Sequence, residues 1–183
     1  MTLIRNICVY CGSGPGSDPA FVGAARTFGK ILAQNGIGLV YGGGSIGLMG
    51  ELANAVLDHG GKAIGIIPEF LLNMEIAHRR GDLIVTRDMH ERKQRMFEHA
   101  DAFVALPGGI GTFEELFEIW TWGYLGLHDK PMGLLDTDGF YAPLLTFLDG
   151  TVDHGFMAQA TRDMLLDAPT PAHLLDMLEA QLR

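Results

Sequence analysis

Residues 102–115 read AFVALPGGIGTFEE and contain three parts in direct succession: an apolar run, a glycine-rich loop and the beginning of a helical pattern. The apolar run has the composition of a buried strand and ends at Pro107. Gly108, Gly109 and Gly111 allow the backbone to approach a ligand closely with its N–H groups exposed. We expect the next helix to begin at Thr112. The stretch therefore predicts one unit of strand, loop and helix.

The same alternation extends along the chain. Short runs rich in Val, Ile and Leu are typical of strands, and they read ICVYC, GLVYG, AIGIIP, DLIVT, AFVALP and PMGLLD. Segments of helical period occupy residues 20–34, 48–59, 89–99, 113–125 and 140–148, and the run MLLDA is a further candidate strand before a helix at 172–182. The pattern predicts an α/β fold, a doubly wound parallel sheet of six to seven strands with helices on both faces.

The composition indicates one globular domain over residues 1–183, since the chain is long enough for one hydrophobic core and short for two. A net charge of -9 argues against nucleic acid or an anionic membrane as partner, because both need clustered Lys and Arg. Residues 31–50 carry no charge, but their glycines argue against a membrane-spanning helix. The amino terminus does not resemble a signal peptide, so we expect a cytoplasmic protein.

Three loops follow predicted strands and should meet at one edge of the sheet: CGSGPGS, GGGSIGLMG and PGGIGTFEE. In the third loop the exposed amides, the Thr112 hydroxyl and the positive end of the helix dipole favour binding of a phosphate. This loop lacks the Gly-Lys-Ser/Thr of a Walker A motif. It therefore does not predict a nucleoside triphosphate with magnesium.

The second loop also matches the dinucleotide fingerprint G-x-G-x-x-G at Gly42, Gly44 and Gly47. Glu69 follows the next predicted strand, near the place of a ribose-binding acid. The fingerprint normally follows the first strand of its unit, whereas here a strand and a helix come earlier. A nicotinamide-dependent enzyme is therefore not favoured.

The same loop contains G-x-S-x-G around Ser45, the pattern of a hydrolase nucleophile elbow. Asp136 with His154 or His173 could complete such a triad in chain order. A serine in a glycine-rich turn is more often only a small turn residue.

Neither the cysteines nor the histidines predict a metal site. Cys8 and Cys11 have C-x-x-C spacing, but they lie in a predicted strand, where a spacing of three places side chains on opposite faces. The sequence HER at 90–92 begins like the zinc motif H-E-x-x-H, but position 94 is Gln. We expect two structural cysteines and no metal.

Glu115 allows two interpretations. Thr112 and Glu115 have the spacing of a capping box, in which the glutamate only bonds the helix start. Glu115 also lies off the apolar stripe of its helix, where it could face a ligand in the loop. The stripe comprises Phe113, Leu116, Phe117 and Trp120.

The segment MHERKQRM places Arg92, Lys93 and Arg95 on a short helix ahead of the same loop. This is the densest cationic cluster of an acidic chain. It is consistent both with ligand binding and with a solvated basic face.

Together GGGSIGLMG, MHERK, PGGIGTFEE and WTWGYLGLHDKP resemble the Lonely guy family, the cytokinin riboside 5'-monophosphate phosphoribohydrolases. The resemblance covers nearly the whole chain. It implies a Rossmann-like homodimer that hydrolyses the N-glycosidic bond of an adenosine 5'-monophosphate, plain or N6-substituted, to free base and ribose 5-phosphate without a cofactor. Related proteins have been labelled lysine decarboxylases, but no lysine here lies in a pyridoxal-type context.

By the same resemblance, Arg92 and Glu115 correspond to the catalytic pair. The corresponding substrate contacts are Ser13, Gly43, Gly44, Glu75, Lys93, Gly108, Gly109, Ile110, Gly111, Thr112, Phe113, Glu114 and Thr121. A carboxylate can stabilise positive charge at the anomeric carbon and take a proton from the attacking water. Arg92 stays protonated, so it suits holding phosphate or ribose.

Two other functions stay open: a carrier that binds a nucleotide-like cofactor without turnover, and a Ser45 hydrolase. The predicted helix after the third loop also bears on assembly. It carries more large apolar side chains than one stripe against a sheet can bury, so we expect a homodimer. These side chains are Phe113, Phe117, Trp120 and Trp122.

Overall fold

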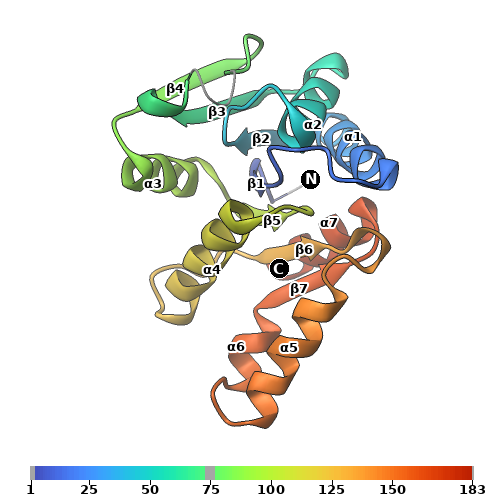
Figure 1. The fold of residues 1–183 in the computed structure, drawn as a ribbon, viewed down its shortest axis with the longest axis vertical. Helices are drawn as coiled ribbons and strands as arrows, with labels where there is room; N and C mark the ends of the chain where they lie inside the picture. Colours follow the sequence, from blue (N-terminus) through green and yellow to red (C-terminus); the bar gives the residue numbers. More distant parts are fainter. Residues whose placement is uncertain (1–2, 73–76, 183) are drawn as a thin grey trace.

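The structure is a computed structural model that describes residues 3–72 and 77–182. Within these residues, seven parallel strands form one sheet in the order β4-β3-β2-β1-β5-β6-β7 (Figure 1). The strands are β1 (Asn6–Tyr10), β2 (Gly38–Tyr41), β3 (Ala63–Pro68), β4 (Asp82–Thr86), β5 (Ala102–Ala105), β6 (Met132–Leu135) and β7 (Leu165–Ala168). The predicted doubly wound parallel sheet is confirmed, and the run MLLDA contains its seventh strand.

Helices cover both faces of the sheet, as predicted. One hydrophobic cluster joins the sheet to α1 (Pro19–Gln34), α2 (Gly47–Asp58) and α7 (Pro171–Ala180). A second cluster joins the opposite face to α3 (Met89–His99), α4 (Ile110–Tyr124) and α5 (Ala142–Asp153). Short elements complete the described chain: the 3-10 turns η1 (Glu69–Leu71) and η2 (Thr137–Gly139), and the helix α6 (Gln159–Asp163).

The two cysteines lie on opposite faces of the sheet, which confirms the prediction from their spacing. Cys8 belongs to the cluster under α3, α4 and α5, and Cys11 to the cluster under α1, α2 and α7. Both thiols are buried and free. Burial raises the pKa of each thiol, and the negative charge of Glu115 raises it further. Both cysteines are therefore neutral core residues.

The helix predicted at 140–148 begins later and extends further, as α5. The residues before it form η2, in which Asp138 adopts a left-handed φ of 52°. The Asp136 carboxylate accepts the backbone N–H of Tyr141 at 2.6 Å, which holds this turn ahead of the helix. Pro143 then lies in the first helical turn. Proline has no backbone N–H, and at this position an N–H would have no acceptor within the helix. The prediction missed α6, which has only five residues.

The strand order reverses between β1 and β5, at the centre of the sheet. The chain proceeds outward from β1 through β2 to β4, then crosses back along α3 to enter β5 (Figure 1). The loops after β1 and β5 meet there, since the Gly12 N–H donates to the carbonyl oxygen of Pro107 at 3.1 Å. In open α/β sheets, ligands bind beyond the carboxyl ends of the strands at such a reversal.

Candidate active site

A cleft of about 400 Å³ opens at this reversal point. Its walls come from the end of β1 and the following loop, from Gly42 after β2, from one side of α3 and from the first turns of α4. The volume falls in the range of small-molecule sites. Of the predicted site residues, the cleft brings together Ser13, Arg92, Gly109, Ile110, Gly111, Thr112, Glu114 and Glu115.

Helix α4 begins at Ile110, two residues before the predicted start. Gly109 is its N-cap and makes no side-chain capping bond, and Thr112 is buried inside the first turn. Glu115 is then the sixth helical residue, beyond the reach of a capping box. The capping-box interpretation of Thr112 and Glu115 is therefore wrong, because the glycine turn itself begins the helix.

The start of α4 presents backbone donors to the cleft. The first N–H groups of a helix have no intrahelical acceptor, and here no capping side chain accepts from them. A Cβ atom added to Gly109 or Gly111 would meet no atom within 4 Å, so both glycines border open space. Together with the helix dipole, this geometry suits a phosphate.

Gly108 has a different role from the two glycines beside the cleft. A Cβ atom at Gly108 would overlap the Thr112 hydroxyl and would lie 3.0 Å from the backbone nitrogen of Gly12. The absence of a side chain therefore lets the turn close against the helix and the neighbouring loop.

Arg92 reaches the cleft from α3 and is 5% exposed. Its Nε donates to the carbonyl oxygen of Ile66 at 3.1 Å, and its Nη2 to that of Gly42 at 2.9 Å. These carbonyl groups lie near the carboxyl ends of β3 and β2. The two hydrogen bonds satisfy the buried guanidinium of Arg92 and fix the orientation of its plane. A Cβ atom at Gly42 would overlap Nη2, which explains the glycine there.

Glu115 lines the same cleft from α4 and is half-buried. Its carboxylate acts electrostatically on the end of β1, where it adds to the effect of burial in raising the pKa of Cys11. Arg92 and Glu115 therefore border one cavity, although they come from helices on different crossover connections.

Lys93 follows Arg92 in α3, but its ammonium lies between two carboxylates of α4. Its Nζ is 2.5 Å from Glu114 Oε1 and 2.9 Å from Glu118 Oε2. Burial lowers the pKa of Lys93, but the hydrogen bonds and charges of these glutamates outweigh it, so the pKa is raised overall. Arg95 lies on the surface, paired with Glu91 and Glu98.

Other predicted site residues lie apart from the cleft. Thr121 is exposed on α4, and its hydroxyl donates to the Phe117 carbonyl oxygen. Phe113 packs edge-to-face on Tyr141 in the core. Glu75 lies outside the described residues.

Gly43 and Gly44 hold neighbouring segments together. The carbonyl oxygen of Gly43 accepts the N–H of His78 at 2.8 Å, and Gly44 forms a bridge with Ala77. Of the three consecutive glycines, Gly42 is the one that lines the cleft.

The sequence pattern does not indicate the apolar wall of the cleft. Met49, Leu71 and Met89 contribute to it together with the end of β1. Met89 could have been found, because it lies three residues before Arg92 on a helix and so shares its face. The other two face the cleft only through the packing of distant segments.

The rival motifs gain no support from the geometry. The G-x-G-x-x-G loop follows β2, whereas the first strand of the sheet is β1. The Asp136 carboxylate accepts a backbone N–H of its own turn, and the His154 ring bonds the carbonyl oxygen of Gly150 within its helix. Asp136 and His154 are thus each bonded within their own turn or helix.

Fold and site together define an α/β protein of Rossmann-like topology. At its cleft, the start of one helix can bind an anion, and an arginine and a glutamate line the same cavity. The family model described as "Possible lysine decarboxylase" matches residues 49–178. Cytokinin riboside 5'-monophosphate phosphoribohydrolase LOG3 of Arabidopsis thaliana is 49% identical over 176 residues, covering 96% of this chain and 82% of the relative. The LOG enzyme of Oryza sativa subsp. japonica is 51% identical, over 96% and 73%. The chain belongs to this family, which contains the LOG phosphoribohydrolases.

Solved structures of similar fold include the molybdenum cofactor binding protein of Rippkaea orientalis, with a TM-score of 0.74, 21% identity and 98% of each chain covered. The molybdenum cofactor carrier protein of Chlamydomonas reinhardtii has a TM-score of 0.71 and 22% identity, over 97% of this chain and 98% of that protein. At these identities the likeness concerns the fold. Among the helices of the described residues, none is long and apolar enough to cross a membrane.

Proposed function

We propose that this chain hydrolyses the N-glycosidic bond of an adenosine 5'-monophosphate, plain or N6-substituted as in a cytokinin riboside 5'-monophosphate. The products are the free base and ribose 5-phosphate. The curated relatives, which are named for this reaction on cytokinin riboside monophosphates, support the proposal. The observation that carries it is the placement of Arg92 and Glu115 on one cleft beside the open start of α4.

In the proposed mechanism the 5'-phosphate accepts hydrogen bonds from the amides at the start of α4. As the bond between base and ribose breaks, positive charge develops at the anomeric carbon, and the Glu115 carboxylate stabilises it. Glu115 also takes a proton from the water whose oxygen bonds to that carbon, while the base leaves with the electron pair of the broken bond and gains one proton, so that one hydrogen of water ends on the base and one on the ribose hydroxyl. Arg92 stays protonated and orients phosphate or ribose. Since water is the only other reactant, the proposal needs no cofactor.

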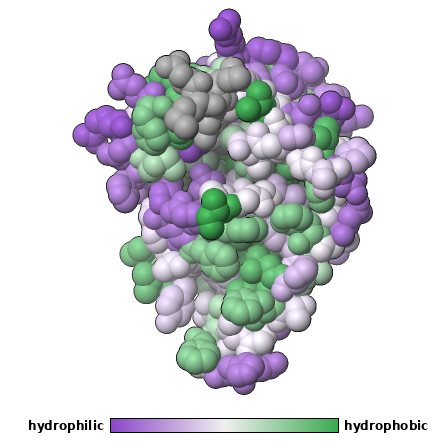
Figure 2. Space-filling model, viewed as in Figure 1, coloured by the Kyte–Doolittle hydropathy of each residue, from purple (hydrophilic) through white to green (hydrophobic). Residues whose placement is uncertain are grey.

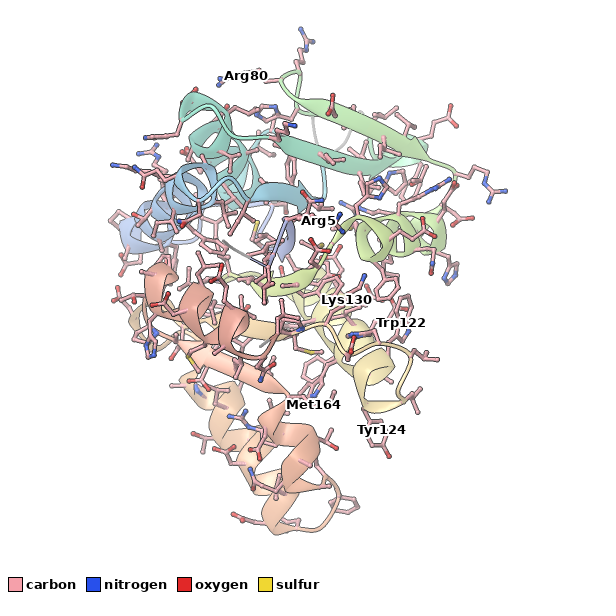
Figure 3. The ribbon with its side chains drawn as sticks, turned by 180° about the vertical axis from the view of Figure 1, so that it is seen from behind. Arg5, Arg80, Trp122, Tyr124, Lys130 and Met164 are labelled. Carbon is pink, nitrogen blue, oxygen red and sulfur yellow. The ribbon has the colours of Figure 1, made fainter. Side chains whose placement is uncertain are left out.

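The proposed assembly is a homodimer in which each chain is a single domain. One sheet carrying seven strands supports the single domain. Large apolar side chains exposed on and after α4 support the dimer, including Phe117, Tyr124 and Phe156. Figure 2 shows apolar side chains gathered where α4, α5 and α6 lie, and Figure 3 shows Tyr124 pointing away from the molecule at the end of α4.

The test is incubation of the chain with adenosine 5'-monophosphate and with its N6-prenylated form, followed by chromatography for the free base. We expect base release from at least one nucleotide, and far less from the nucleosides without phosphate. Tight binding without release would favour a carrier. Ester cleavage that Ser45→Ala abolishes would favour the Ser45 hydrolase. Equal turnover of nucleoside and nucleotide would remove the phosphate role of the α4 start.

A further inference from the structure

The parallel ladder between β1 and β5 becomes irregular just before the glycine loop. Tyr10 lies opposite Ala105, and the Leu106 N–H continues the ladder by donating to the carbonyl oxygen of Tyr10 at 2.9 Å. In a regular parallel ladder the next bond would run from the Gly12 N–H to the carbonyl oxygen of Leu106. Here the Gly12 N–H donates instead to the carbonyl oxygen of Pro107 at 3.1 Å. The Leu106 carbonyl group therefore leaves the ladder at the residue where the loop begins.

The side chain of Tyr141 provides a donor for this carbonyl group. Its hydroxyl donates to the carbonyl oxygen of Leu106 at 2.6 Å, in a buried bond between residues 35 positions apart. Burial raises the pKa of Tyr141, so its hydroxyl stays protonated and can donate. A buried carbonyl oxygen without a donor is costly, and the Tyr141 hydroxyl replaces the donor that the ladder would have supplied.

The ring of Tyr141 also contacts the other end of the loop. It packs edge-to-face on Phe113 in the first turn of α4, with ring centroids 6.4 Å apart. Leu106 and Phe113 flank residues 107–112, which contain the backbone amides of the proposed phosphate site. Tyr141 therefore contacts both ends of the segment that would bind the phosphate.

Tyr141 itself is fixed by the turn between β6 and α5. The Asp136 carboxylate accepts its backbone N–H at 2.6 Å. The Phe140 ring packs edge-to-face on Tyr141 at 4.9 Å and on Phe21 of α1 at 5.7 Å. Among the residues that the structure describes, those lining the cleft include Gly109 and Thr112 but not Tyr141. Tyr141 can therefore affect a ligand only through the loop.

Glu115 is held in a different way. It lies beyond the first turn of α4, and this part of the helix is fixed by its buried residues Leu116, Ile119 and Trp120. Loss of the bond between Tyr141 and Leu106 should therefore move the amides at the helix start more than the carboxylate of Glu115.

We propose that Tyr141 is a positioning residue for the phosphate site. Its hydroxyl holds the Leu106 carbonyl group out of the ladder, and so keeps residues 107–112 in the conformation that presents the amides at the start of α4 to a phosphate. This inference rests on the proposed function, in which that helix start binds the 5'-phosphate.

The test is Tyr141→Phe, which removes the hydroxyl and keeps the ring. The Leu106 carbonyl oxygen can then return to the ladder as acceptor of the Gly12 N–H, which moves Pro107 and the amides that follow it. Calorimetry with ribose 5-phosphate should therefore give a Kd about tenfold higher than that of the wild type. With the nucleotide that the wild type hydrolyses, KM should rise about tenfold and kcat should stay within about threefold, because Glu115 keeps its place.

An unchanged Kd for ribose 5-phosphate in folded Tyr141→Phe would overturn the proposal, even with a lower unfolding temperature, since Tyr141 would then support only the core. Thr151→Val is the matched control. The Thr151 hydroxyl also donates to a backbone carbonyl oxygen, that of Leu148 at 2.6 Å, but within α5. This variant should keep the wild-type Kd. Equal weakening in both variants would indicate a general effect of lost stability and would overturn the proposal.

Asp136→Ala provides a second variant, and circular dichroism establishes the folding of each. It leaves the Tyr141 hydroxyl in place but removes the acceptor of the Tyr141 backbone N–H, so the Kd for ribose 5-phosphate should rise about threefold. If Tyr141→Phe does not fold, this variant decides, and a wild-type Kd in folded Asp136→Ala would then overturn the proposal.

Failure of the inference can be distinguished from failure of the proposed function, because binding of ribose 5-phosphate is measured without hydrolysis. A wild type that binds ribose 5-phosphate but releases no base would overturn the function alone, and the Kd of Tyr141→Phe would still decide the inference. Absence of ribose 5-phosphate binding by the wild type would overturn the inference, because it removes the phosphate site through which Tyr141 would act.

Discussion

Glu115 is the residue on which the proposed chemistry depends, and an isosteric change separates its charge from its shape. Glu115→Gln should lower kcat about 100-fold to 1,000-fold, because the amide cannot stabilise positive charge at the anomeric carbon or accept the proton of water. The unfolding temperature should change little, since Glu115 is not a helix cap. Base release by chromatography and a thermal melt check both expectations. Retained turnover would exclude Glu115 from the chemistry.

Arg92 combines a structural and a functional role, which two substitutions can separate. Lysine keeps the charge but cannot donate in one plane to Ile66 and Gly42, so Arg92→Lys should lose much of the rate. Arg92→Ala should lower kcat/KM about 100-fold or more and destabilise the fold by roughly 1–3 kcal/mol, because buried carbonyl groups lose their donor. Kinetics and urea unfolding measure the two effects. If folded Arg92→Ala kept full activity, Arg92 would have only a structural role.

At the scale of the element, the start of α4 should bind the phosphate through its backbone. A methyl group at Gly111 enters open space beside the cleft, so Gly111→Ala should fold normally and raise KM for the nucleotide about tenfold. Gly108→Ala is the matched control: its methyl group overlaps the Thr112 hydroxyl, so this variant should lose stability. KM and unfolding temperature are measured for both. An unchanged KM in Gly111→Ala would argue against phosphate at this helix start.

For the whole molecule, the apolar side chains beyond the cleft predict self-association. A groove of about 290 Å³ between α4 and the segment before α6 is lined by Phe117, Tyr124 and Phe156, and Phe156 is 90% exposed. Light scattering at micromolar concentration should give the mass of two chains. Phe156→Asp should shift this mass toward one chain, because it places a charge on the apolar face.

Val85→Asp is the control for that measurement. Val85 is 51% exposed on β4, at the sheet edge opposite β7, and the change adds the same charge. This variant should keep the mass of the wild type. A single-chain mass for the wild type, or equal dissociation of both variants, would contradict the proposed interface.

Much of the fold follows from local properties of the sequence. Strands such as AFVA and helices such as MHERKQRMFEH show their own periodicity, and their alternation restricts the sheet to parallel pairing with crossover helices. The glycine loops after three strands then indicate the edge where a ligand binds. These features depend on neighbouring residues, so they can be predicted without knowledge of the tertiary structure. Arg92 and Glu115 are indicated by family resemblance and not by local pattern, because a solvated basic face and a capping box explain the same residues equally well.

The tertiary structure alone decided which side chains meet. Arg92 bonds carbonyl groups 26 and 50 residues away, and Lys93 bonds a glutamate 21 residues away. No local period encodes such contacts, since they depend on how α3 and α4 cross the sheet. The same holds for the start of α4 at Ile110, which the packing of Gly108 against Thr112 determines in place of a side-chain cap. The sequence by itself determined the class of fold and the edge that carries the site, and long-range packing decided how its charged groups are oriented.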